Sequence, residues 1–126
     1  MTGRPTRPRK LARADDVSAF DSGAPELDRW LHRYAWENLR ANNAIPYVTT
    51  LDERVVGYYA IAAGGIEREA VPSVLQRGAR PNPLPVIVLA RLAVDSSVAG
   101  AGVGAGLLRD ALERSALLSE ALGAAA

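Results

Sequence analysis

The sequence contains no cysteine and a single histidine, His32. The lack of cysteine excludes disulfide bonds, thiolate metal ligands and a cysteine nucleophile. One histidine does not build a zinc site, and His32 lies among charged residues on the expected surface of a helix, so we interpret it as solvated. No apolar run approaches the roughly 20 residues of a membrane span, and the basic start lacks the apolar segment of a signal peptide. We therefore expect a cytoplasmic protein without a metal site.

The length and composition are those of one folded domain. A chain of 126 residues with 48% hydrophobic and 23% charged residues can form a single modest core. The net charge of +1 conceals an asymmetry, because residues 1–13 hold five basic residues and no acidic one: Arg4, Arg7, Arg9, Lys10 and Arg13. Since this stretch also holds two prolines, we expect a mobile, extended arm over 1–13 and a folded domain over 14–126. The arm is either a solvated tail or a contact for nucleic-acid phosphates.

The hydrophobic pattern predicts an order of elements. A helix is expected over 24–41, and strands over 46–51 and 55–61 form a hairpin that Gly64 and Gly65 bring to an end. The proline-rich segment 66–85 is expected to be a loop, and its arginines Arg68, Arg77 and Arg80 form a second basic cluster. A strand covered on both faces is expected over 86–94, followed from about residue 103 by a helix. The apolar face of that helix is expected to comprise Leu107, Leu108, Ala111, Leu112, Ser115, Leu118 and Leu122. This order predicts an α+β fold with helices packed on a mixed sheet.

A glycine-rich turn joins the last predicted strand to the last predicted helix. Gly100, Gly102, Gly104 and Gly106 alternate with alanine and valine, which leaves backbone N–H groups unobstructed at the positive end of a helix dipole. Such a turn is typical of a phosphate site. It is not a P-loop, because no lysine follows Lys10. The dinucleotide pattern G-x-G-x-x-A also fits, although little chain follows it, and a flexible glycine–alanine linker is a further alternative.

The turn also resembles the pyrophosphate loop of GNAT acyltransferases, Gln/Arg-x-x-Gly-x-Gly/Ala. Gly102 and Gly104 take the two glycine positions, and Ala99 stands where Gln or Arg is usual. The segments 20–31, 55–59, 83–86, 89–95 and 107–112 are similar to the GNAT toxins of bacterial toxin–antitoxin pairs. The most specific part is Arg-Leu-Ala-Val-Asp followed by the glycine turn. The resemblance covers most of residues 10–122, and it implies a GNAT fold, with helices flanking a mixed sheet whose last strands are missing from this chain.

The resemblance implies an enzyme that moves an acetyl group from acetyl-CoA to the α-amino group of aminoacyl-tRNA and thereby blocks translation. A ribbon-helix-helix antitoxin is the implied protein partner, and a homodimer is expected. Two alternatives stay open. One is a GNAT acetyltransferase that acts on a small amine or a protein N-terminus. The other is an inactive copy that only binds CoA or an antitoxin.

The resemblance also implies roles for particular residues. The backbone of Leu92, Ala93 and Val94 would pair with the pantetheine arm, and the Val94 N–H would stabilise the oxyanion of the reacting thioester. Arg91 would either face the phosphates of the acceptor or anchor its strand by an ion pair, while Arg77 and Arg80 would flank the acceptor. The residues implied for the pyrophosphate are Gly100, Ala101, Gly102, Val103, Gly104 and Ala105.

The chain departs from the family pattern in two places. Ala99 and Ala101 lack the polar or basic side chains common in the loop, so we expect a reduced affinity for CoA. The tyrosine of the family motif Tyr-x-x-x-Gly-Phe, which protonates the departing thiolate, is absent. We therefore expect either a fragment of a longer protein or a shortened copy, with little transferase activity of its own.

Overall fold

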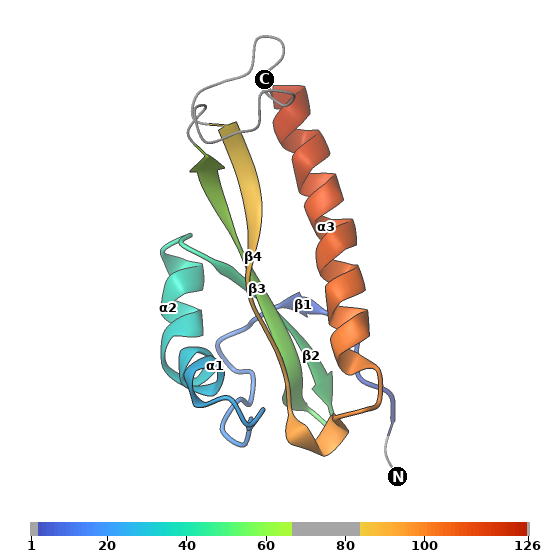
Figure 1. Ribbon diagram of the computed structural model, residues 1–126. Coiled ribbons are helices and arrows are strands. Elements are labelled where there is room, and N and C mark those ends of the chain that lie inside the picture. The colour runs from blue at the N-terminus through green and yellow to red at the C-terminus, as the bar shows by residue number, and fades with distance from the viewer. Residues whose placement is uncertain (1–2, 67–83, 126) are drawn as a thin grey trace.

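The structure is a computed structural model that describes residues 3–66 and 84–125 (Figure 1). The expected loop over 66–85, with Arg68, Arg77 and Arg80, thus falls almost wholly outside the described residues. Within them, no helix is both long enough and apolar enough to cross a membrane.

An antiparallel sheet forms the frame of the molecule. Its strands are β1 (Arg9–Lys10), β2 (Ile45–Leu51), β3 (Arg54–Ile66) and β4 (Leu84–Val94), in the order β1-β2-β3-β4. The expected hairpin is confirmed, with a two-residue turn between the paired residues Leu51 and Arg54. The expectation that Gly64 and Gly65 end the hairpin is wrong: both lie in β3, paired with Val86 and Pro85 of β4. A glycine adopts the extended conformation when a neighbouring strand continues the ladder, so the pair does not mark a strand end here.

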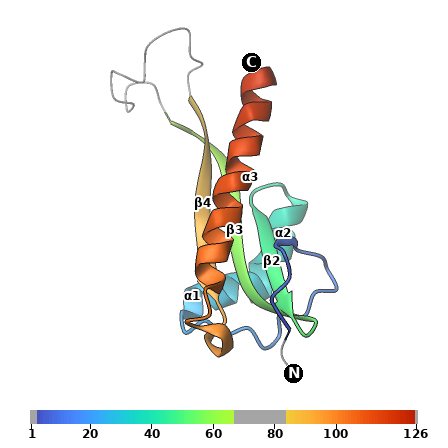
Figure 2. The ribbon, with the colours of Figure 1, turned by 90° about the vertical axis from the view of Figure 1, so that its right-hand side faces the viewer.

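Helices cover both faces of this sheet. The expected helix over 24–41 is confirmed as three consecutive helical segments: the α-helical α1 (Pro25–Arg29), the π-helical η1 (Trp30–Tyr34) and the α-helical α2 (Ala35–Arg40). Pro25 stands at the first position, where its missing N–H has no helical partner to lose. The last helix, α3 (Val103–Ala125), begins where the pattern predicts. Figures 1 and 2 show α1 and α2 on one face of the sheet and α3 on the other.

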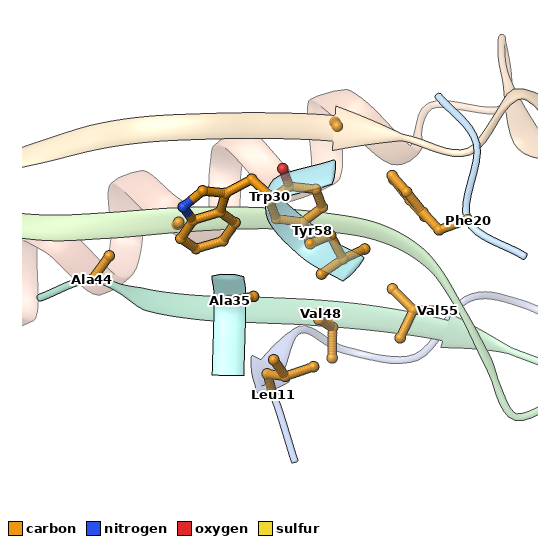
Figure 3. Close-up of a cluster of buried hydrophobic side chains, with 11 residues drawn as sticks. Leu11, Phe20, Trp30, Ala35, Ala44, Val48, Val55 and Tyr58 are labelled. Atoms are coloured by element: carbon orange, nitrogen blue, oxygen red, sulfur yellow. The ribbon is translucent and has the colours of Figure 1, made fainter. Parts of the chain in front are cut away.

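Two cores lie on the two faces of β3. On the first, Tyr58 packs between Trp30, whose ring is stacked at a centroid distance of 5.8 Å, and Phe20, whose ring meets it edge-on at 5.6 Å (Figure 3). On the second, Tyr59 is stacked on Tyr47 and belongs to a cluster with Leu107 and Ala111 of α3. Neighbouring residues of a strand point to opposite faces, so Tyr58 and Tyr59 each fill a different core.

Two expectations about burial are wrong in part. The side chains of Val88 and Leu89 in β4 are 45% and 41% exposed, because β4 is the outermost strand of the described sheet and is not covered on both faces along its length. In α3, Leu107 is buried, whereas Leu108 and Leu112 are 44% and 65% exposed. The helix therefore contacts the sheet through fewer of its apolar residues than the sequence pattern predicts. Leu122 lies outside the described side chains.

The N-terminal arm is extended as expected, but it is attached to the sheet rather than mobile. The Thr6 N–H donates to the Thr50 carbonyl at 2.8 Å, and the Leu11 N–H donates to the Pro46 carbonyl at 2.9 Å. The Leu11 side chain is buried in the first core. Arg9 forms an ion pair with Asp15 at 2.7 Å, which neutralises part of the basic cluster. The arm is held because the edge of β2 offers hydrogen-bonding groups that its backbone satisfies.

Gly57 sets how closely α3 approaches the sheet. A Cβ atom at this position would lie 3.0 Å from Leu107 Cδ1, 3.0 Å from Thr49 Cγ2 and 3.2 Å from Val103 Cγ1. We predict that Gly57→Val lowers the free energy of unfolding by about 1–3 kcal/mol through overpacking, as measured by urea denaturation. Gly106→Ala is the control, because no atom lies within 4 Å of its added Cβ. It should leave the stability unchanged or raise it by up to about 1 kcal/mol. A Gly57→Val protein as stable as the wild type would contradict this packing.

Candidate cofactor-binding site

The glycine turn links β4 to α3 and contains two residues in the left-handed backbone conformation. After β4 come Asp95 and the short 3₁₀ helix η4 (Ser96–Val98), and then Gly100 and Gly102 adopt φ angles of +79° and +85°. Such angles are unfavourable for residues with a Cβ, so these two positions require glycine. The N–H of Gly106 donates to the Gly102 carbonyl at 3.0 Å and makes the first helical hydrogen bond. The N–H groups before it, in the first turn of α3, have no helical acceptor and are available to an anion.

Asp95 fixes the position of this turn, a role that the sequence analysis did not assign. Its carboxylate accepts hydrogen bonds from the N–H of Asp21 at 2.8 Å and from the N–H of Ser97 at 3.0 Å. It also accepts one from the Ser97 hydroxyl and lies 4.0 Å from the Arg54 guanidinium. The aspartate that ends the Arg-Leu-Ala-Val-Asp block thus ties the start of the turn to the segment before α1. The sequence signal for this cap was an aspartate directly after a predicted strand and before two serines.

The pKa of Asp95 reflects these contacts. Burial raises the pKa, since only 4% of the residue is exposed. The hydrogen bonds from Ser97 and from the Asp21 N–H, together with the positive charge of Arg54, outweigh burial and hold the pKa of Asp95 below its ordinary value. The carboxylate is therefore charged at neutral pH and stabilises the folded chain.

Two cavities flank the turn. The first, of about 570 Å³, lies between the N-terminal arm and the first turns of α3, and its lining includes Arg4, Thr6, Gly102 and Val103. The second, of about 390 Å³, lies toward the hairpin turn of β2 and β3, and its lining includes Asp52, Arg54 and Ala99. Ala101 and Val103 line both cavities. The turn is thus open to a ligand on two sides.

The outer edge of β4 presents backbone groups next to this turn. The Asp95 N–H donates to the Val56 carbonyl of β3 at 2.8 Å. Because successive N–H groups of a strand point to opposite edges, the N–H of Val94 points away from β3. The side chains of Leu92 and Val94 pack against the second core, and Ala93 is buried in the first. Leu92 and Val94 therefore offer a ligand their backbone groups rather than their side chains, whereas the backbone groups of Ala93 point toward β3.

Of the residues expected on the acceptor side, Arg91 lies within the part of the chain that the structure describes. The guanidinium carbon of Arg91 lies 4.6 Å from the centroid of the Trp30 ring, a cation–π contact that joins β4 to η1. Among the described residues no ion pair involves Arg91, so the ion-pair anchor, one of the two roles expected for it, is not seen there, and a contact with the acceptor stays a prediction. Arg77 and Arg80 lie outside the described residues.

Tyr58 and Tyr59 hold elements together rather than facing the open edge of β4. The Tyr58 hydroxyl donates to the Leu27 carbonyl at 2.6 Å, and burial raises the pKa of Tyr58 to about 12. The Tyr59 hydroxyl donates to Asp110 at 2.6 Å and accepts from Arg114 at 3.0 Å. The pKa of Tyr59 is also raised, mainly by burial and to a smaller extent by the hydrogen bond to Asp110. Both hydroxyls stay protonated at neutral pH.

Comparison with known proteins gives several relatives, among them the following two. The chain is 42% identical over 116 residues to the tRNA-acetylating toxin of Mycobacterium tuberculosis, a match that covers 92% of this chain and 69% of the toxin. It is 31% identical over 114 residues to a probable toxin TacT of Sinorhizobium fredii, covering 87% of this chain and 62% of that protein. The chain thus spans about two thirds of the length of these relatives. No protein-family model matches it.

Several solved structures share the fold, among them the following three. The toxin AtaT in complex with acetyl-methionyl-tRNAfMet has a TM-score of 0.81 and 29% identity, over 95% of this chain and 74% of that one. AtaTR bound with acetyl-CoA has a TM-score of 0.76 and 31% identity, and the match covers 90% of this chain and 70% of that one. A tyrosine-to-phenylalanine variant of AtaT bound to the C-terminus of the antitoxin AtaR has a TM-score of 0.78 and 28% identity, over 96% and 70%.

The fold and the glycine turn define an acetyltransferase domain of the GNAT type. Within this class, the chain belongs to the tRNA-acetylating toxins of toxin–antitoxin systems, as the resemblance of its motifs implied.

We predict that the Asp95 carboxylate stabilises the fold in a pH-dependent way. Replacing it by alanine should cost about 1–3 kcal/mol at pH 7, because buried N–H groups lose a charged acceptor. Since the folded-state pKa is lowered, this stabilisation is present above the ordinary value of about 4 and is lost as the pH falls through the lowered value. Urea denaturation of the wild type and Asp95→Ala from pH 7 to pH 2 should therefore show a difference that shrinks in acid.

Asp52→Asn provides the control, since Asp52 is an exposed turn residue and asparagine tolerates its φ of 51°. Its effect on stability should be small at every pH. A difference for Asp95→Ala that stays constant down to pH 2 would contradict the role given to the carboxylate.

Proposed function

We propose that this protein is a toxin that transfers the acetyl group of acetyl-CoA to the α-amino group of aminoacyl-tRNA and so blocks translation. The single observation that carries the choice of acceptor is the 42% identity, over 92% of the chain, to a tRNA-acetylating toxin. The complex of AtaT with acetyl-methionyl-tRNAfMet, at 29% identity, supports the same acceptor class.

The residues around the glycine turn fit acetyl-CoA. The first-turn amides of α3 are suited to the pyrophosphate, and the left-handed Gly100 and Gly102 let the backbone approach it without a Cβ in the way. The pantetheine arm would lie along the free edge of β4, hydrogen-bonded to the backbone of Leu92 to Val94 as an added strand. The AtaTR structure with acetyl-CoA, at 31% identity, supports this donor.

When bound, acetyl-CoA supplies a thioester whose carbonyl carbon is open to attack by an amine. The Val94 N–H, directed away from β3, would donate a hydrogen bond to the oxygen on which negative charge develops. An α-amino group has a pKa of about 7.7–8.0, so a useful share is neutral at pH 7 and no strong base is required. The hydroxyls of Tyr58 and Tyr59 already donate hydrogen bonds to Leu27 and Asp110, so we assign neither tyrosine a role in proton transfer.

The proposal extends to partners and place of action. The AtaT structure with the C-terminus of AtaR supports an antitoxin as the protein partner. We assign it to the ribbon-helix-helix class and assign a homodimeric state to the toxin, as the resemblance of the motifs implies. Aminoacyl-tRNA is a cytoplasmic substrate, which places the activity in the cytoplasm.

Acetyl transfer by the chain is tested with the protein in excess over methionyl-tRNA in the presence of acetyl-CoA. After nuclease digestion, mass spectrometry should detect acetyl-methionyl-adenosine, formed slowly because these residues lack the family tyrosine, whereas free methionine and small amines should remain unmodified. Acetylation of the free amines, with methionyl-tRNA left intact, would favour the alternative acceptor class. Absence of transfer to every acceptor would contradict a transferase activity of these residues.

The glycine turn is tested by a matched pair of substitutions. Gly102 and Gly23 have similar φ angles, +85° and +88°, and no atom lies within 4 Å of an added Cβ at either position. Alanine therefore introduces comparable backbone strain, about 1–3 kcal/mol, at both sites. We predict that Gly102→Ala weakens the binding of acetyl-CoA at least tenfold in calorimetric titrations, while Gly23→Ala leaves it unchanged. Equal losses from both would show that the effect is one of stability rather than of the turn.

A further inference from the structure

The glycine turn lacks a positively charged side chain of its own. Residues 96–106 contain no lysine, arginine or histidine, and alanines stand at positions 99 and 101. The amides of a helix start provide only about half a positive charge. The nucleotide part of acetyl-CoA carries several negative charges on its phosphates. A cation from another part of the chain would therefore complete the site.

The N-terminal arm brings such a cation to the turn. Arg4 lines the 570 Å³ cavity together with Ala101, Gly102, Val103 and Gly106 of the turn and α3. In Figures 1 and 2, the chain leaves β1 and runs past the start of α3 toward the N-terminus. Residues almost 100 positions apart in sequence thus form the walls of one cavity.

The arm is fixed by hydrogen bonds to β2 and to α3. The Thr6 hydroxyl accepts from the Thr50 N–H at 2.9 Å, and the Thr6 N–H donates to the Thr50 carbonyl at 2.8 Å. Further along, Arg114 of α3 donates to the Pro8 carbonyl at 3.2 Å. These hydrogen bonds begin two residues after Arg4. They limit the space that its side chain can reach, which reduces the entropy lost when the guanidinium binds a ligand.

Two other arginines near the turn, Arg54 and Arg114, are already engaged, and the exposed Arg109 of α3 lines neither of the two cavities. Arg54 donates to the Ser97 hydroxyl at 2.9 Å and lies beside the Asp95 carboxylate. Arg114 is paired with Asp110 at 3.2 Å. Within residues 3–66 and 84–125, no ion pair involves Arg4, whose side chain is exposed at the cavity. Its charge is available to a phosphate.

We propose that Arg4 binds the nucleotide phosphates of acetyl-CoA, in place of the basic or polar side chain that the turn lacks at Ala99 and Ala101. The inference rests on the proposed function, because it assigns a further residue to the same donor site. It gives the basic arm a role in binding the cofactor, distinct from a solvated tail and from a contact with nucleic acid. A guanidinium suits this task because its N–H groups match two phosphate oxygens at once.

The test compares Arg4→Gln with Arg7→Gln, which removes the same charge from an exposed arm residue outside the lining of either cavity. Calorimetric titration with acetyl-CoA should show an affinity about tenfold lower for Arg4→Gln and unchanged for Arg7→Gln. The affinity of the wild type for acetyl-CoA should fall more steeply with salt than the affinity of Arg4→Gln. Salt screens the ion pair between Arg4 and a phosphate, and the variant lacks this pair. Arg4→Lys should recover part of the loss. The urea midpoint of all variants should match the wild type, because the side chains are exposed.

The outcomes separate this inference from the proposed function. If the wild type binds acetyl-CoA and Arg4→Gln binds it equally well, the role of Arg4 is overturned while the donor site stands. Equal weakening by Arg4→Gln and Arg7→Gln would also overturn it, because the effect would then be the general charge of the arm. If the wild type does not bind acetyl-CoA, the proposed function itself fails.

Discussion

Two neighbouring tyrosines on β3 hold the layers of this protein together. Tyr58 and Tyr59 are both fully buried, and because they are adjacent on a strand they enter opposite cores. Each aromatic ring removes on the order of 150–250 Å² from water, which is a large share of the stability of a small domain. Each hydroxyl then fixes a helix, since Tyr58 bonds to Leu27 of α1 and Tyr59 bonds to Asp110 of α3. Both helices are thereby placed relative to one strand.

The candidate site follows from this placement. Gly57, directly before the tyrosines, lets the first turn of α3 lie close to the sheet, opposite Val94 of β4. Asp95 then ties the start of the glycine turn to the segment before α1. The outward N–H of Val94 and the amides at the start of α3 thus belong to two elements held by the same core. A site that must present a thioester and a pyrophosphate at a fixed separation needs this kind of rigid support.

Much of this arrangement could be predicted from the sequence. The alternation of the strands, the Pro25 helix start and the glycine turn are local signals, and the structure has the corresponding elements close to the expected places. Long-range contacts were not predictable in the same way. The attachment of Thr6 to Thr50 and the contact of Arg91 with Trp30 depend on which elements lie side by side in the folded chain. The extent of burial on β4 and α3 was overestimated, because an apolar residue in a regular pattern shows which face is available and not how much of it is covered.

The proposed activity depends on one binding mode, in which acetyl-CoA lies along the outer edge of β4 and on the amides of the glycine turn. Amide NMR of the chain, titrated with acetyl-CoA, tests it residue by residue. We predict that the largest changes in amide chemical shift fall on Leu92 to Val94 and on Gly100 to Ala105, while the exposed His32 on η1 is unaffected. Changes confined to other surfaces, or no saturable change at all, would contradict it.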